Sequence, residues 1–130
     1  EPSADTAPVP PPRGSEHVLL VEDDPAVRGM TARALRALGY EVTEAASGGA
    51  ALDVVRAGHA FDLLISDLRM PGIQGQDLAR RLREERPSVR VLFVSGLVSE
   101  LERDLFLDAE VLEKPFTLDG LARAVRRALG

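Results

Sequence analysis

The 130-residue chain contains no cysteine. This absence excludes thiolate catalysis, a cysteine-ligated zinc site and a secreted disulfide framework, and it allows a reducing compartment. No apolar run approaches the roughly 20 residues that a membrane span needs. The amino end also lacks the basic and then apolar pattern of a signal peptide. We therefore expect a cytoplasmic domain that makes no contact with a membrane.

Basic residues are fewer than acidic residues in this sequence. The sequence has 16 Lys and Arg against 21 Asp and Glu, so its formal net charge is −5. This balance argues against a general nucleic-acid-binding surface, and we expect no nucleic-acid partner. A glycine-rich phosphate loop of the Walker type is absent too, so no nucleotide is expected to bind here. The two histidines, His17 and His59, are expected at the surface.

The first 16 residues hold five prolines, including the run Pro10-Pro11-Pro12. Such a segment buries too little apolar area to offset its ordering entropy, which predicts a semi-extended, disordered linker over residues 1–16. A proline ligand for a partner domain is the alternative interpretation. Because the chain starts with Glu1 and not with Met, we expect it to be part of a longer protein.

Residues 17–130 form one domain in which short apolar runs alternate with helical patterns. Five strands and five helices in alternation predict a doubly wound α/β fold with a parallel sheet and right-handed crossovers. The strands are expected at residues 18–21, 40–45, 63–67, 90–95 and 111–113. The helices are expected after Asp24, after Ser47, at about 75–85, at about 100–107 and after Thr117, with Gly39 and Gly58 closing the first two.

The helix after Asp24 has its own expected start and face. Pro25 suits the first helical position, where its missing N–H costs nothing. Val27, Met30, Ala34, Leu35 and Leu38 recur at helical spacing and are expected to face the core. Asp24 itself is expected to cap this helix.

Polar side chains follow four of the five strands. Taken alone, Asp67 could equally be the cap of the Pro71-Gly72 turn. The carboxyl ends of parallel strands share one edge of a sheet, however, and ligands bind at that edge. The side chains expected to converge there are Glu22 and Asp23, Asp67, Ser95 and Lys114.

So dense an acidic edge needs a cation. Two carboxylates about 4 Å apart repel by roughly 4 kcal/mol at an effective dielectric constant of 20. Oxygen ligands without His or Cys favour Mg²⁺. Asp67 could then attack a phosphorus atom and form an aspartyl-phosphate, while Lys114 and Ser95 stabilise the transferred group.

Four motifs stand in order along the chain at the ends of the predicted strands. They are Val21-Glu22-Asp23-Asp24, Ser66 to Gly72 (SDLRMPG), Val94-Ser95-Gly96 and Glu113-Lys114-Pro115-Phe116. Together they resemble the signature positions of the response-regulator receiver domain of two-component signalling, over residues 17–130. The resemblance implies a flavodoxin-like (βα)5 fold with strand order 2-1-3-4-5.

The resemblance also implies roles for individual residues. Asp67 would accept a phosphoryl group from the phosphohistidine of a histidine kinase dimerisation/phosphotransfer domain or of a histidine phosphotransfer protein. Glu22, Asp23, Asp67 and the backbone carbonyl of Arg69 would hold Mg²⁺, with Asp23 favoured over Glu22 as a direct ligand. Lys114 would contact the phosphoryl group and precede a cis peptide bond to Pro115. Ser95 would be the switch hydroxyl.

Two departures from the family pattern concern the switch. Val111 occupies the position where receivers usually carry an aromatic residue, and the segment from Ser95 to Lys114 is a few residues shorter than the family norm. A valine cannot swing between two positions as a ring does. We therefore expect a smaller conformational response to phosphorylation than in an aromatic-switch receiver.

The leading hypothesis is a phosphoacceptor signalling domain that is not an enzyme in its own right, although it assists its own phosphorylation and dephosphorylation. From the layout of the chain we favour the carboxyl-terminal receiver of a hybrid histidine kinase over a stand-alone regulator. A phosphorylation-independent interaction module is the alternative. A phosphatase is disfavoured, because the position for its second acid is Arg69.

Overall fold

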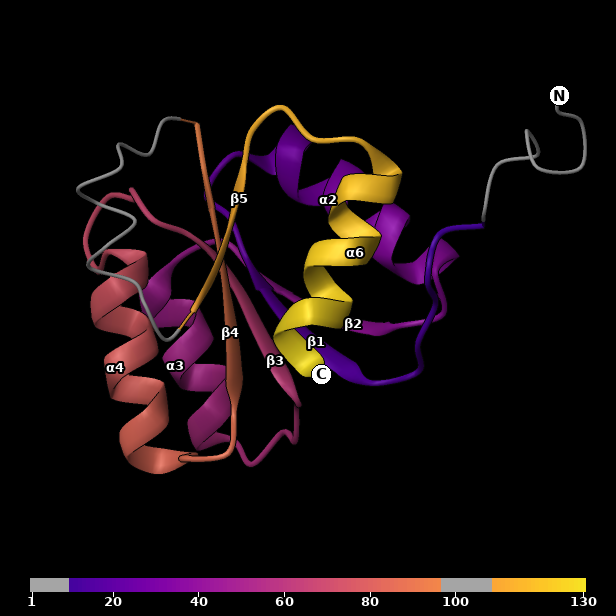
Figure 1. The fold of residues 1–130 in the computed structure, drawn as a ribbon. Coiled ribbons are helices and arrows are strands. Elements are labelled where there is room, and N and C mark those ends of the chain that lie inside the picture. Colours follow the sequence, from indigo (N-terminus) through magenta and orange to yellow (C-terminus); the bar gives the residue numbers. More distant parts are fainter. Residues whose placement is uncertain (1–9, 97–108) are drawn as a thin grey trace, which may run out of the picture.

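The computed structural model describes residues 10–96 and 109–130 (Figure 1). In these ranges it contains a five-stranded parallel sheet of order β2-β1-β3-β4-β5, which confirms the expected fold. The strands are β1 (His17–Val21), β2 (Glu41–Ala45), β3 (Leu63–Asp67), β4 (Arg90–Ser95) and β5 (Glu110–Glu113). The helices are α2 (Pro25–Ala37), α3 (Gly48–Arg56), α4 (Gly75–Glu85) and α6 (Leu118–Leu129).

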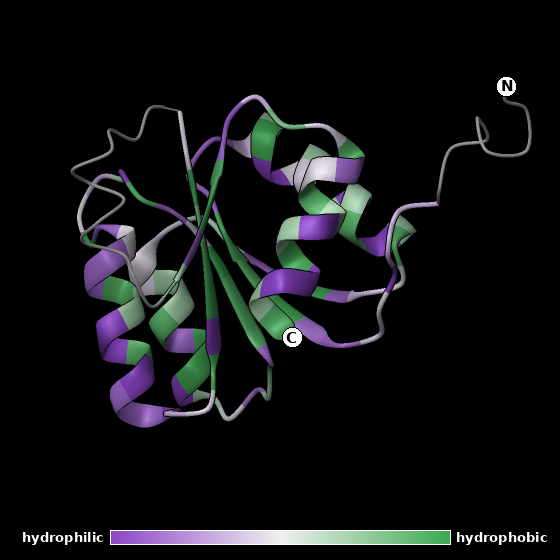
Figure 2. Ribbon diagram, in the orientation of Figure 1, coloured by the Kyte–Doolittle hydropathy of each residue, from purple (hydrophilic) through white to green (hydrophobic). Residues whose placement is uncertain are grey.

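Helices cover both faces of the sheet, α3 and α4 on one side and α2 and α6 on the other (Figure 1). Successive strand residues point to opposite faces, so a strand buried on both sides must be apolar throughout. In β3, for example, Leu64 packs toward α3 and α4, whereas Leu63 and Ile65 pack toward α2 and α6. Figure 2 shows the result, with hydrophobic strands between helices whose outer faces are hydrophilic.

The register brings the carboxyl ends of neighbouring strands to one edge. Val21 of β1 pairs with Ser66 of β3, and Asp67 pairs with Val94 of β4. Ser95, the last residue of β4, pairs with Glu113, the last residue of β5. The residues that follow these strands therefore meet at the same edge, as the sequence predicted.

Helix starts and ends follow the expected capping chemistry. The Asp24 carboxylate accepts hydrogen bonds from Ala26 N and Val27 N, at 2.9 and 3.3 Å. Ser47 caps α3 and Thr117 caps α6. Each hydroxyl oxygen accepts a hydrogen bond from the backbone N–H three residues further along the chain. Gly39 and Gly58, with φ of 103° and 91°, have the left-handed backbone predicted for helix ends.

Some details differ from the prediction. β1 and β5 each begin one residue earlier than expected, and β2 begins at Glu41. Met30 is 53% exposed and does not face the core. The buried stripe of α2 runs through Thr31, Ala32 and Leu35, because the hydroxyl of Thr31 is satisfied by the carbonyl of Val27 at 2.8 Å and can therefore be buried.

Other predictions concern residues beyond the described ranges or at their margin. The helix expected at about residues 100–107 lies outside them. The linker expected over residues 1–16 is described only from residue 10, and its last residues contact the domain, since Gly14 N donates to Leu38 O at 3.1 Å. Within residues 10–96 and 109–130, the helices are too short and too polar to cross a membrane.

Candidate functional site

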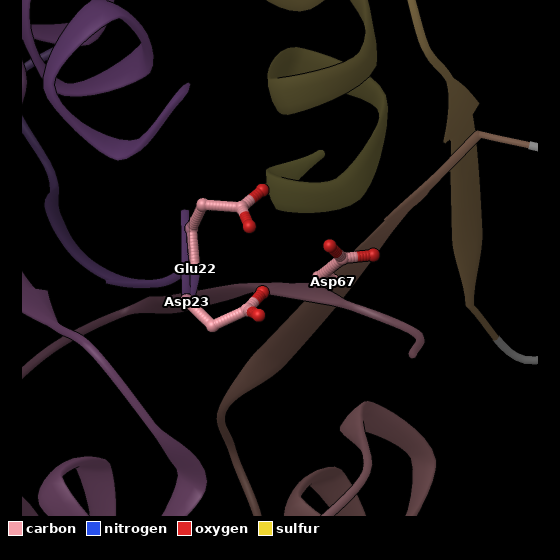
Figure 3. A group of neighbouring side chains, drawn as sticks. All are labelled: Glu22, Asp23 and Asp67. Carbon is pink, nitrogen blue, oxygen red and sulfur yellow. The ribbon is translucent and has the colours of Figure 1, made fainter. Parts of the chain in front are cut away.

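Three carboxylates meet at the carboxyl edge of the sheet. Glu22 and Asp23 directly follow β1, and Asp67 ends β3. One carboxylate oxygen from each lies within 4.8 Å of the others. Figure 3 shows the three side chains facing a common space from two neighbouring strands. This convergence was predicted, and it comes from parallel pairing of β1 with β3.

Lys114, which follows β5, reaches this acidic group from the other side of Asp67. Its Nζ donates to Glu22 Oε1 at 2.7 Å and to Asp67 Oδ2 at 3.1 Å. The side chains are 25%, 6% and 13% exposed respectively, so the two ion pairs are largely shielded from water. The peptide bond between Lys114 and Pro115 is cis, as expected.

Burial and neighbouring charges shift the pKa values of Glu22 and Lys114. Burial raises the pKa of Glu22 above its ordinary value, and repulsion by Asp67 adds to it. Hydrogen bonds from Lys114 and from Asp24 N offset part of this rise. Burial alone would lower the pKa of Lys114, but its bonds to Glu22 and Asp67 outweigh burial, and the pKa of Lys114 is raised. Lys114 is therefore held in its charged form.

Asp24 belongs to the helix and not to the acidic group. Its carboxylate is used in capping α2, and its backbone N–H donates to Glu22 Oε2 at 3.2 Å. Both carboxylate oxygens of Glu22 thus accept hydrogen bonds, one from Lys114 and one from Asp24. Of the two acids after β1, the exposed Asp23 has the more accessible carboxylate.

An open hollow of about 420 Å³ lies beside the acidic group. It is lined by Asp67, Arg69, Ser95, Gly96 and Lys114. Ser95 is 2% exposed, and its carbonyl accepts a bond from Lys114 N at 2.7 Å, which ties the end of β4 to the residue after β5. The structure therefore brings together the carboxylate, the hydroxyl and the ammonium that the sequence placed at separate strand ends.

The donor set suits a hard divalent cation. All three clustered groups offer carboxylate oxygen, and no sulfur or imidazole ligand lies among them. Carboxylates with additional water are the ligands that Mg²⁺ prefers. Three acids against one lysine also leave an excess of negative charge, which a cation would neutralise. The residues present therefore fit Mg²⁺.

Two supporting residues were not identified from the sequence. Gly75, the first residue of α4, lies so close to the phosphoacceptor candidate that a Cβ there would collide with the backbone oxygen of Asp67. Arg28 donates to the carbonyl of Glu22 at 2.8 Å and pairs with Glu44 at 3.6 Å, which holds the loop after β1. The sequence does show a glycine at a predicted helix start, three residues after the Pro71-Gly72 turn. It does not show that this glycine packs against Asp67, because that contact depends on tertiary structure.

Comparison with known proteins places this site in context. The sequence model of a family described as "Response regulator receiver domain" matches residues 18–126. The chain is 44% identical over 120 residues to the sensor kinase CckA of Brucella abortus (strain 2308), covering 89% of this chain and 13% of the kinase. It is 34% identical over 117 residues to the response regulator receiver protein CpdR of the same organism, covering 88% of this chain and 97% of CpdR.

A solved structure of a response regulator has a similar fold. The response regulator protein TrrA of Thermotoga maritima, crystallised in complex with Mg(2+)-BeF, superposes with a TM-score of 0.77 at 31% identity. The alignment covers 88% of this chain and 99% of TrrA. The chain thus spans a small part of one relative and nearly the whole of two others.

Proposed function

Because the chain belongs to the response regulator receiver domain family, we propose that it is a phosphoacceptor signalling domain in which Asp67 accepts a phosphoryl group. The observation that carries this proposal is the grouping of Glu22, Asp23 and Asp67 within 4.8 Å beside the ammonium of Lys114. A carboxylate at a strand end, between a cation site and a lysine, can serve as a nucleophile toward phosphorus.

The transfer follows from the positions of these groups. An oxygen of Asp67 attacks the phosphorus of a phosphohistidine, so that an O–P bond forms while the P–N bond breaks. The departing imidazole nitrogen keeps the electron pair and takes a proton from solvent. Lys114 exchanges its bonds to Glu22 and Asp67 for a bond to a phosphoryl oxygen, and the hydroxyl of Ser95 donates to another.

A divalent ion such as Mg²⁺ would neutralise negative charge on the transferring phosphoryl group when bound. We propose Asp23, Asp67 and the backbone carbonyl of Arg69 as its direct protein ligands. Glu22 is proposed to act on the ion through water, because both of its carboxylate oxygens already accept hydrogen bonds, at 2.7 and 3.2 Å.

The donor is proposed to be the phosphohistidine of a kinase dimerisation/phosphotransfer domain or of a histidine phosphotransfer protein. Support comes from an apolar hollow of about 330 Å³ next to the site, lined by Val27, Met30, Lys114, Pro115 and Phe116. Met30 is 53% exposed there, although it is a large apolar residue. A partner helix packed on this hollow could present its histidine toward Asp67.

Two settings for the domain have equal support. The 44% identity to the sensor kinase CckA supports a receiver within a hybrid histidine kinase, which is the first proposed setting. The match to 97% of CpdR supports a stand-alone regulator to the same degree. An immunoblot of the native polypeptide decides between them, because a hybrid kinase is several times larger than this domain.

Phosphorylation is tested by incubating the domain with Mg²⁺ and acetyl phosphate and recording its intact mass. We expect one added phosphoryl group on the wild type and none on Asp67→Asn. The control is Asp53→Asn, an exposed acid on α3, which should be labelled like the wild type. Equal labelling of Asp67→Asn, or an unlabelled wild type, would contradict the proposal.

The alternative is an interaction module with this fold that works without phosphorylation. Val111 favours it, because this half-buried residue pairs with Phe93 and packs against the core at the position where receivers usually carry an aromatic residue. An unlabelled wild type that still binds its partner would support this alternative.

A further inference from the structure

The segment that precedes β1 lies against the domain at a defined place. Gly14 N donates to Leu38 O at 3.1 Å, and Glu41 N donates to Glu16 O at 3.1 Å. These two bonds hold the backbone of residues 14–16 against the turn between α2 and β2. The family match begins only at residue 18, so residues 14–16 lie outside it, whereas their partners Leu38 and Glu41 lie within it.

A two-pronged ion pair joins the same segment to α6. The two carboxylate oxygens of Glu16 accept from Arg126 Nη1 and Nη2 at 3.0 and 2.9 Å. Arg126 also donates to Tyr40 Oη at 3.4 Å and to Gly130 O at 3.3 Å. The paired side chains are 30% and 28% exposed. This bidentate geometry restricts orientation more than a single exposed contact does.

Two glycines let the backbones approach this closely. A Cβ on Gly14 would collide with the ring of Tyr40, and a Cβ on Gly39 would collide with the carbonyl oxygen of Gly14. Gly39 also has a φ of 103°, which strains any other residue. An ion pair formed by chance at the surface would need neither glycine.

We propose that the Leu38–Tyr40 turn and Arg126 form an intramolecular docking site for residues 14–16, which makes residues 10–16 a directed strut and not a free tether. Its direction is maintained upstream by Pro10-Pro11-Pro12, since consecutive prolines favour a stiff polyproline II helix. The inference does not depend on phosphorylation of Asp67.

The docking site lies at the edge of the sheet opposite to the acidic group. His17 starts β1 at the docked end, whereas Glu22 follows its last residue, Val21. Five strand residues at about 3.3 Å each separate the two edges by roughly 16 Å. Residues 14–16 are therefore docked away from the Asp67 edge.

The absence of cysteine allows a direct test by spin labelling. We label Arg13→Cys, an exposed residue next to the docked segment that leaves the three prolines intact, together with Asp53→Cys, an exposed residue of α3, and measure their distance distribution by pulsed electron resonance. We expect one narrow peak in the otherwise unaltered chain. Glu16→Gln should broaden it, and the charge exchange Glu16→Arg with Arg126→Glu should restore the narrow peak.

Amide exchange gives a second readout on the same variants. Glu16→Gln should speed exchange of the Gly14 amide about fivefold or more, because docking is weakened there. Arg123→Gln is the matched control, since Arg123 pairs at 2.7 Å only with Asp119 of its own helix among the described residues. It should change neither the peak nor the exchange rate.

Other results would overturn the docking site. A broad distribution before any change at Glu16 would show that the segment is free. An equally narrow peak in Glu16→Gln would show that the ion pair does not hold it. If the charge exchange stayed as broad as Glu16→Gln, direct pairing of the two residues would be refuted. Far-UV circular dichroism verifies that each variant is folded.

Discussion

The ammonium nitrogen of Lys114 lies closer to Glu22, at 2.7 Å, than to Asp67, at 3.1 Å. Glu22 is only 5% exposed, and its other carboxylate oxygen is bonded to Asp24 N at 3.2 Å. Without a metal, Lys114 is therefore the main partner of a buried acid. In the proposed transfer Lys114 leaves Glu22 to reach the phosphoryl group, which would link the stability of the site to its activity.

Replacing Lys114 with methionine should destabilise the metal-free domain. The change leaves Glu22 without a positively charged partner, with only the bond from Asp24 N, and we expect the free energy of unfolding to fall by about 1–3 kcal/mol. Mg²⁺ should restore part of this loss because it neutralises the same carboxylates. Urea denaturation with and without Mg²⁺ measures both effects, with Arg123→Met on the surface of α6 as control. Wild-type stability of Lys114→Met without Mg²⁺ would contradict this.

Mg²⁺ itself should stabilise the folded domain. A ligand at a hundredfold excess over its Kd adds about 2.7 kcal/mol to the free energy of unfolding. Asp23→Asn should abolish most of this gain, because it removes an exposed carboxylate from the group of three. Thermal unfolding with Mg²⁺ and with a chelator checks the prediction, and Asp53→Asn should respond like the wild type. The proposed site fails if Asp23→Asn retains the full gain.

Much of this site could be predicted because it depends on strand ends. Parallel strands place their carboxyl ends at one edge whatever their exact register, so Glu22, Asp67 and Ser95 could be assigned to a common edge from the apolar runs before them. The pairing of Lys114 with Glu22 could not be predicted in this way. It depends on side-chain conformations and on distances of a few ångströms between β1 and the residue after β5.

Residues whose role depends on tertiary contacts were harder to predict. The pattern of α2 suggested that Met30 is buried, but Thr31 takes the inward position, since the Val27 carbonyl satisfies its hydroxyl at 2.8 Å. Glu16 was assigned to a linker because local composition says nothing about Arg126, which lies 110 residues away. Such contacts between distant segments leave no periodic signal in a single sequence.

Replacing Gly75 or Gly49 with alanine should change the free energy of unfolding in opposite directions. In Gly75→Ala the new Cβ collides with the backbone of Asp67, so we expect a loss of about 1–3 kcal/mol in the free energy of unfolding and weaker Mg²⁺ binding. In Gly49→Ala the new Cβ meets only Ser47 Oγ at 3.9 Å, and alanine in α3 should stabilise by up to about 1 kcal/mol. Chemical denaturation and calorimetric Mg²⁺ titration measure these effects. Equal effects of the two changes would refute this account.

Phosphorylation should produce a limited conformational response. A bond from Ser95 to the phosphoryl group is worth about 1.5–3 kcal/mol, whereas a shift from 1:99 to 99:1 needs roughly 5.5 kcal/mol. We expect backbone amide shifts confined to the site in the wild type, fewer in Ser95→Ala, and more in Val111→Tyr, which supplies a ring beside Phe93. NMR spectra before and after phosphorylation compare the three. Shifts as widespread in the wild type as in Val111→Tyr would contradict this prediction.

The ion pair between Glu16 and Arg126 should make stability depend on acid pH. The hydrogen bond from Arg126 is the main cause that lowers the pKa of Glu16 below 4.5. Because the pKa of Glu16 is lowered in the folded state, the stabilisation by the ion pair is complete above pH 4.5. This stabilisation is lost as the pH falls through the pKa of Glu16 in the folded protein. Glu16→Gln should therefore cost about 1 kcal/mol at pH 7 and progressively less as the pH falls below 4.5. Urea denaturation across this range, with Glu84→Gln as an exposed control, tests the sign, and a cost of Glu16→Gln that grew toward low pH would refute it.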